Sequence, residues 1–75
     1  MNFDIVFEQE EDRRWIAEIP EIPGVLAYGV TPLQAKAKAK ALVLRVLAER
    51  MENEVSIPDI NYIEFVNHYG SVAIN

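Results

Sequence analysis

The chain has 75 residues, no cysteine, 51% hydrophobic residues and a formal net charge of −5 at pH 7. This length allows one domain, and the lack of cysteine excludes disulfides and thiolate metal sites. No apolar run approaches the ~20 residues of a membrane span, and the N-terminal residues lack the pattern of a signal peptide. We therefore expect one cytoplasmic domain over residues 1–75. A chain this small buries a modest share of its surface. The high proportion of apolar residues therefore suggests that a partner covers some of them.

The charge is unevenly distributed along the chain. Residues 31–52 contain five basic and two acidic side chains, which gives +3. The remaining residues contain two arginines and ten carboxylates, which gives −8. A nucleic acid would be repelled by such a domain, so we expect no direct nucleic-acid binding. A basic protein partner would fit the acidic part better.

Three short strands are predicted in the first 30 residues. Residues 3–8 alternate between apolar and mainly polar side chains, which is typical of a strand. The charged residues 10–14 predict a hairpin turn. Residues 15–19 and 25–30 form the next two strands, and the alternation places Trp15 on the same face as Gly29. Small residues on that face would allow a helix to approach closely.

The turn between the second and third strands is framed by Pro20 and Pro23. Proline fixes φ and lacks a backbone donor, so neither residue suits a central strand. Gly24 then supplies conformational freedom directly after the second proline. This segment predicts a stiff, proline-framed turn.

A helix is predicted from Pro32 to about Met51. Thr31 is the expected N-cap, Pro32 occupies the first helical position, and Gln34 can complete a capping box. At 100° per residue this helix has two apolar sides. One should pack on the sheet and the other on a second subunit or the C-terminal segment. The first side consists of Ala35, Ala39, Leu42, Val43 and Val46. The second includes Leu33, Ala37, Ala41, Leu44, Leu47, Ala48 and Met51.

The C-terminal part predicts a fourth strand over residues 60–66. Its alternation places Glu64 and Val66 on one side and Phe65 on the other. A turn at residues 68–70 follows, and residues 71–75 form a short strand or fray.

No combination of residues predicts catalysis. His68 is the single histidine, and no serine or cysteine nucleophile accompanies it in a motif. The carboxylates that alternate with apolar residues on the strands are typical of the solvent face of a half-buried sheet. A metal-dependent nuclease would need several of them to converge, and the alternative stays open for Asp4, Glu18 and Glu64. We expect no enzyme activity, no metal and no cofactor.

Residues 15–32 carry a resemblance to a known family. The segment contains the sequence Pro-Glu-Ile-Pro-Gly at residues 20–24, followed one short strand later by Gly29, Thr31, Pro32, Leu33, Gln34 and Ala35. An acidic turn at residues 11–12 and the Trp-Ile-Ala strand at residues 15–17 precede it. Together these elements resemble the HicB family of antitoxins, over roughly residues 3–50.

The resemblance implies a β-β-β-α-β domain with a partial ribonuclease H-like fold. Its sheet would have three or four strands, mostly antiparallel, with one long helix on one face. It also implies an inactive domain that masks the catalytic surface of a small HicA-like RNA-cleaving toxin. Many relatives carry a C-terminal DNA-binding module, which we do not expect in this chain. We expect Trp15, Glu18 and Tyr28 to lie in the partner-binding region.

A second hypothesis is a solitary homo-oligomeric structural or interaction domain without a toxin partner. It rests on the second apolar side of the helix, with Leu33, Ala37, Leu44, Leu47 and Met51 as the expected oligomer face. The two hypotheses are compatible with each other.

Overall fold

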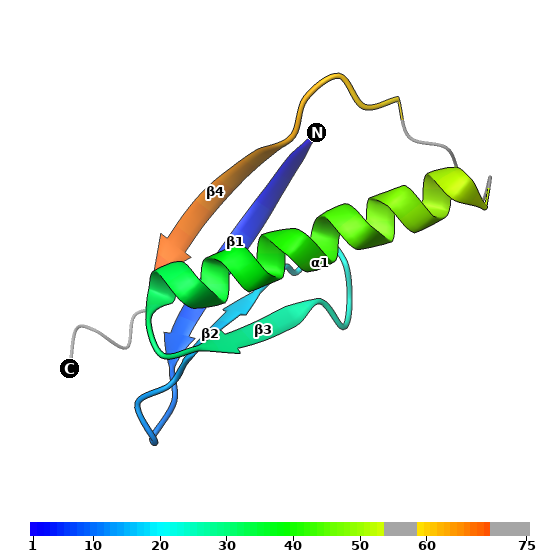
Figure 1. The fold of residues 1–75 in the computed structure, drawn as a ribbon. Helices are drawn as coiled ribbons and strands as arrows, with labels where there is room; N and C mark the ends of the chain where they lie inside the picture. Colours follow the sequence, from blue (N-terminus) through cyan, green and yellow to red (C-terminus); the bar gives the residue numbers. More distant parts are fainter. Residues whose placement is uncertain (54–58, 70–75) are drawn as a thin grey trace.

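The computed structural model describes residues 1–53 and 59–69, which form one open sheet and one helix (Figure 1). This arrangement confirms the coarse prediction of an α+β fold. Within the described residues, the helix is not long and apolar enough to cross a membrane. The elements are β1 (Asn2–Gln9), β2 (Trp15–Glu18), β3 (Leu26–Gly29), α1 (Pro32–Glu52) and β4 (Glu64–Tyr69).

The four strands lie in the order β3-β2-β1-β4. β1 pairs with β2 and β2 with β3 in antiparallel fashion, whereas β4 runs parallel to β1. Hairpin connections suffice for the antiparallel pairs, but a parallel pair needs a long crossover. The segment that contains α1 provides this crossover, and it carries the chain from one edge of the sheet to the other.

β4 lies further along the chain than the sequence predicts. It spans Glu64–Tyr69 instead of residues 60–66, so His68 and Tyr69 belong to a strand and not to a turn. The pairing with β1 explains this position, because Phe65 lies opposite Phe3 and stacks on it with ring centroids 5.9 Å apart. Tyr69 likewise stacks on Phe7 at 4.7 Å. The short strand predicted at residues 71–75 lies outside the described residues.

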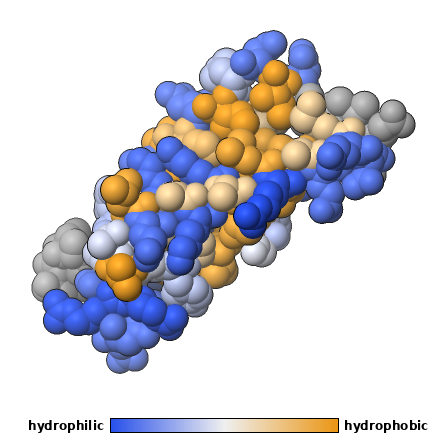
Figure 2. Space-filling view, viewed as in Figure 1, coloured by the Kyte–Doolittle hydropathy of each residue, from blue (hydrophilic) through white to orange (hydrophobic). Residues whose placement is uncertain are grey.

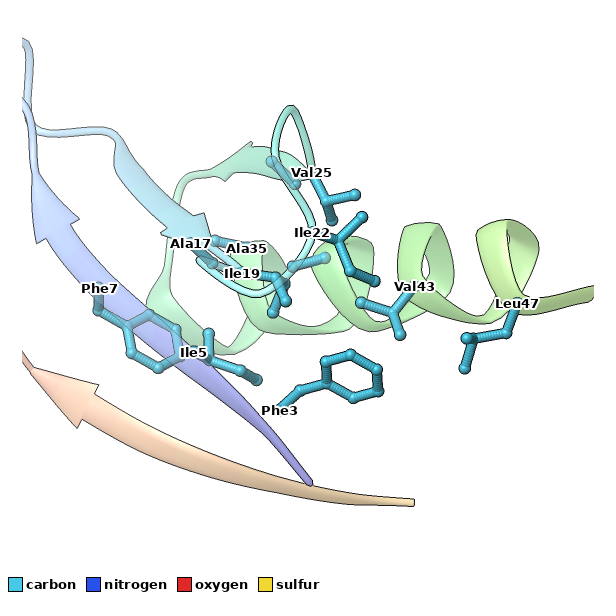
Figure 3. Close-up of a cluster of buried hydrophobic side chains, with 12 residues drawn as sticks. Phe3, Ile5, Phe7, Ala17, Ile19, Ile22, Val25, Ala35, Val43 and Leu47 are labelled. Atoms are coloured by element: carbon cyan, nitrogen blue, oxygen red, sulfur yellow. The ribbon is translucent and has the colours of Figure 1, made fainter. Parts of the chain in front are cut away.

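The hydrophobic core lies between α1 and one face of the sheet (Figure 3). Alternate side chains of β1 point into it, as the period of two predicts, and the proline-framed turn adds further apolar residues. Leu42 and Val46 are partly buried and pack against this core, as predicted. The buried residues are Phe3, Ile5, Phe7, Ala17, Ile19, Ile22, Val25, Ala27, Ala35, Ala39, Val43 and Leu47.

The buried row of α1 follows every fourth residue and ends at Leu47. The sequence interpretation assigned Leu47 to the opposite, oligomer-forming side, and this assignment is wrong, because Leu47 is only 4% exposed. Residues four apart on a helix form a ridge inclined to the helix axis. Packing along that ridge carries the contact around the helix, from Ala35 to Leu47.

The start of α1 is fixed by three polar contacts and one close approach. Thr31 Oγ1 accepts a hydrogen bond from the backbone N–H of Gln34 at 3.1 Å. Gln34 Oε1 in turn accepts one from Val30 N at 2.7 Å, one residue before the N-cap. Ala35 N donates to Thr31 O at 3.1 Å. Gly29 allows the first turn to approach β3, since a Cβ at Gly29 would lie 2.5 Å from Ala35 N.

Candidate functional site

The face of the sheet opposite α1 is the candidate binding surface. Phe3, Ile5 and Phe7 point toward the helix, so the alternate residues of β1 point away from it. The strand registers extend this outer face across all four strands. Among the residues that the structure describes, no helix packs on it (Figure 1). We call it the open face, and its side chains are Asp4, Val6, Glu8, Ile16, Glu18, Leu26, Tyr28, Glu64, Val66 and His68.

Apolar side chains occupy much of the open face. In the register, Ile16 lies opposite Tyr28, and Glu18 lies between Leu26 and Val6. Tyr28 is 37% exposed and Leu26 is 38% exposed. A sheet face usually carries polar residues where it meets water. These apolar side chains therefore suit a surface that another protein covers.

Four carboxylates are interspersed with the apolar side chains. Glu8, Glu18 and Glu64 are exposed, and Asp4 is half-buried. Asp4 Oδ1 lies 2.8 Å from Nε2 of His68, on the neighbouring strand. A face with apolar patches between carboxylates fits a basic, partly apolar partner.

The contact with His68 changes the acidity of Asp4. The hydrogen bond with the imidazole stabilises the carboxylate and lowers the pKa of Asp4 below its ordinary value. Partial loss of solvation acts in the opposite direction but is the smaller effect. Glu21 also reaches this corner, where its carboxylate oxygens accept from Asp4 N at 3.1 and 3.2 Å. Asp4 therefore stays ionised while it links β1 to β4.

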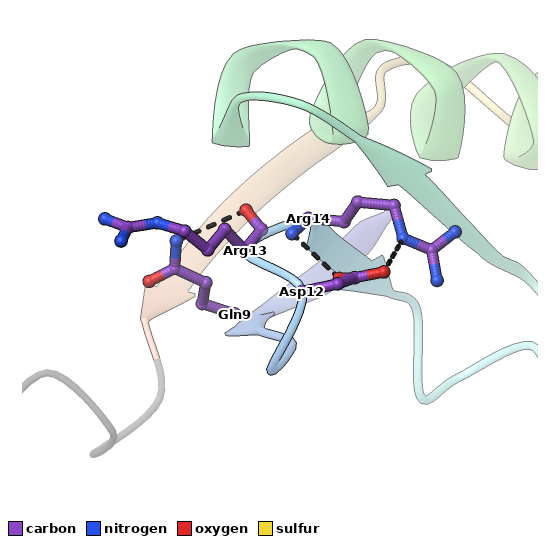
Figure 4. Close-up of polar contacts among 4 residues, drawn as sticks. All are labelled: Gln9, Asp12, Arg13 and Arg14. Carbon is purple, nitrogen blue, oxygen red and sulfur yellow. Dashed lines mark hydrogen bonds and ion pairs between the residues drawn. The ribbon is translucent and has the colours of Figure 1, made fainter.

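The β1–β2 hairpin turn places a cation at the border of the open face (Figure 4). Asp12 accepts from Arg14 N at 3.1 Å and from Arg14 Nε at 2.7 Å. Gln9 donates to the carbonyl of Arg13, which has a positive φ of 74°. The guanidinium of Arg14 lies 4.6 Å from the centre of the Tyr28 ring. The backbone hydrogen bond from Arg14, assisted by its side chain, lowers the pKa of Asp12.

The three residues expected in the partner-binding region do not share one face. Glu18 and Tyr28 lie on the open face. Trp15 pairs with Gly29 on the helix side, where it is partly buried and packs against the core. Trp15 therefore packs on the helix side of the sheet, on the opposite face from Glu18 and Tyr28.

The proline-framed turn has the structural role that the sequence predicts. Pro20 and Pro23 are exposed, and Gly24 has a φ of 88° that favours glycine. Ile22 and Val25 are buried and continue the core below the turn. The turn therefore joins β2 to β3 and closes one end of the core.

The open face contains residues that the sequence interpretation did not assign to binding. Leu26 and Val66 belong to it, and so does the pair formed by Asp4 and His68. The alternation of the second strand alone places Ile16 and Glu18 on the face opposite the inward residues. This signal could have identified part of the open face. The meeting of Asp4 with His68 could not be foreseen, because it depends on the parallel register of β1 and β4.

The expected oligomer face of α1 is largely exposed. Leu33 is 73% exposed, Leu44 is 51% exposed and Met51 is 47% exposed, while Ala37 is also exposed. Leu47 does not belong to this set because it is buried. The other residues form a second apolar surface that is separate from the open face.

The described residues show surface chemistry suited to binding. In residues 1–53 and 59–69, no three side chains of histidine, aspartate or glutamate converge to hold a metal ion. Comparison of the chain with protein-family models, with curated proteins and with solved structures gives no significant match. The open face and the resemblance of residues 15–32 are therefore the features that bear on function.

Proposed function

We propose that this chain is a HicB-like antitoxin domain that binds a small, basic, HicA-like RNA-cleaving toxin through the open face. The same proposal assigns the fold to the partial ribonuclease H-like type. The chain acts by protein–protein contact and performs no catalysis itself. The observation that carries the proposal is an acidic, partly apolar sheet face opposite the helix.

The chemistry of the open face supports a basic partner. An enzyme that cleaves RNA needs a positively charged surface for the phosphate backbone. Glu18, at the centre of the open face between Leu26 and Val6, would meet such a surface with opposite charge. The neighbouring apolar side chains would supply contact area that water leaves on binding. A partner held in this way would have its RNA-binding surface covered.

The order of the elements also supports the proposal. The resemblance implies three strands, a helix and a fourth strand, and the chain has β1, β2, β3, α1 and β4 in that order. The turn at residues 20–24 joins β2 to β3, and Thr31 caps α1, so the residues that carry the resemblance occupy defined structural positions.

The proposal is tested by co-expression with the product of the adjacent gene. We expect that gene to encode a small basic protein whose expression alone stops growth, and we expect the chain to restore growth. Glu18→Lys should reduce the rescue, because it reverses a charge in the middle of the open face. Glu49→Lys is the matched control, since it makes the same change on the exposed surface of α1.

Two outcomes would contradict the proposal. One is a neighbouring gene product that is not toxic or is not bound by this chain. The other is equal loss of rescue in both lysine variants, since this would show that overall charge and not the open face determines binding. Soluble expression of both variants, checked by circular dichroism, ensures that the comparison reports binding.

A further inference from the structure

The outward surface of α1 contains an apolar seam with a spacing different from that of its buried row. Figure 2, viewed from the helix side, shows hydrophobic side chains among charged ones over this surface. Four of the five seam residues are exposed, and Ala41 is half-buried. The seam consists of Ala37, Ala41, Leu44, Ala48 and Met51.

The seam residues are separated by four, three, four and three positions. This is the heptad spacing of a helix that packs lengthwise against another helix. The buried row, in contrast, recurs every four residues through Ala35, Ala39, Val43 and Leu47. One helix therefore carries two contact surfaces, and the sheet side covers the surface that contains the buried row. The heptad surface points away from the sheet and is available to a second helix.

The sizes of the seam residues fit a second copy of the same helix in the antiparallel direction. With the two helices centred at the level of Val46, Ala41 lies opposite Met51 of the other copy. Leu44 then lies opposite Ala48 of the other copy, and the remaining two layers repeat these pairs by symmetry. Each layer thus combines one small and one large side chain. A parallel pair in register would instead place alanine on alanine and leucine on leucine, which alternates gaps with crowding.

The charges beside the seam favour the same arrangement. Lys38, Arg45 and Glu52 border it on one side at intervals of seven residues. In the antiparallel register Lys38 lies beside Glu52 of the second copy, and the symmetry produces this ion pair twice. The two Arg45 side chains meet at the two-fold axis, where they weaken the contact. The opposed helix dipoles also favour the antiparallel direction.

We propose that two copies of this chain associate through an antiparallel pair of α1 helices, with the seam residues Ala41, Leu44, Ala48 and Met51 at the centre. The two-fold symmetry closes the assembly as a dimer. Both open faces remain on the outside, so each copy keeps its surface for another partner. The seam is about two heptads long and its helices are already folded, so we expect a dissociation constant on the order of 10–100 μM.

Sedimentation equilibrium of the full chain tests the association. The wild type should change from monomer to dimer over this concentration range. Leu44→Glu should remain monomeric, while the same change at Leu33, a more exposed leucine of α1 outside the paired layers, should dimerise like the wild type. A wild type that stays monomeric at several hundred micromolar, or a Leu44→Glu variant that dimerises normally, would overturn the proposal.

Single-cysteine variants test the direction of the helices, because the chain has no cysteine of its own. Arg45→Cys places the two thiols at the two-fold axis, so a disulfide dimer should form readily under mild oxidation. Lys38→Cys places them about 24 Å apart along the axis, so it should not cross-link. Efficient cross-linking of Lys38→Cys and none of Arg45→Cys would exclude the antiparallel register.

A charge exchange tests the ion pairs independently. Lys38→Glu or Glu52→Lys alone should weaken the dimer about tenfold, because each creates two like-charge contacts. The double variant restores opposite charges and should recover most of the wild-type affinity. If the double variant dimerises more weakly than either single variant, Lys38 does not meet Glu52 of the second copy and the register is wrong.

Discussion

Gly29 is the position where the packing of α1 on the sheet is most sensitive to a single added methyl group. In Gly29→Ala the new Cβ would lie 2.5 Å from Ala35 N and 3.1 Å from Ala35 Cα. The first distance is about 0.9 Å shorter than ordinary van der Waals contact. Because the neighbours are backbone atoms of the first helical turn, they cannot rotate away. The helix or β3 must shift to accept the methyl group.

The expected cost follows from two opposing effects. Overpacking of this kind destabilises a protein by about 1–3 kcal/mol. Replacing a strand glycine with alanine returns roughly 0.5–1 kcal/mol, because the unfolded chain loses freedom. The net loss in the free energy of unfolding should be about 1–2 kcal/mol. In a domain of this size that corresponds to a fall in Tm of roughly 5–15 °C.

Thermal and urea denaturation followed by circular dichroism measure this change. Gly24 provides the control, because its φ is 88° but no atom lies within 4 Å of an added Cβ. Gly24→Asn should be better tolerated than Gly24→Ala, since asparagine adopts positive φ more readily. Gly29→Asn should be at least as harmful as Gly29→Ala, since space and not φ limits that site. A Gly29→Ala protein as stable as the wild type would refute the close packing of α1 on β3.

Two further predictions concern polar contacts. Thr31→Ala should lower the free energy of unfolding by about 1 kcal/mol, because it removes the N-cap acceptor of α1. Thr31→Ser should keep most of the wild-type stability, because serine retains the hydroxyl. Equal urea midpoints for both variants would contradict the capping role. Acid should lower the free energy of unfolding through Asp4, because the pKa of Asp4 is lowered in the folded state. Its stabilising contribution is complete above the ordinary aspartate pKa near 3.8 and is lost as the pH falls through the lower, folded-state value. Urea unfolding between pH 6 and pH 2.5 should therefore show a smaller acid loss for Asp4→Asn than for the wild type, and an identical loss would contradict this contribution.

Local signals in the sequence determine much of the fold. Thr31 and Pro32 mark the start of α1 because capping and the fixed φ of proline act within one turn. The first three strands follow from alternation and from the turn that Gly24 permits. Their predicted limits differ from the observed ones by at most one residue at either end. These features depend on neighbours in the chain and so can be predicted from it.

Features that depend on distant contacts were harder to predict. β4 is shifted because its position depends on stacking of Phe65 and Tyr69 against β1. Leu47 was assigned to the wrong side of α1. The angle of 100° per residue places each side chain around the helix but does not show which flank the sheet covers. The alternation of β2 shows that Ile16 and Glu18 share the open face, but the extension of this face to Val66 and His68 requires the parallel register.

The central claim, that the open face binds a basic partner, is tested most directly by the affinity of the purified chain for the toxin proposed as its partner. Isothermal titration calorimetry would compare Leu26→Asp, on the open face, with Leu44→Asp, on the exposed surface of α1. Both leucines are partly exposed, so both variants should fold. We predict that Leu26→Asp weakens binding at least tenfold and that Leu44→Asp leaves it within about twofold of the wild type. Equal affinities for the wild type and Leu26→Asp, with loss of binding in Leu44→Asp, would contradict the account.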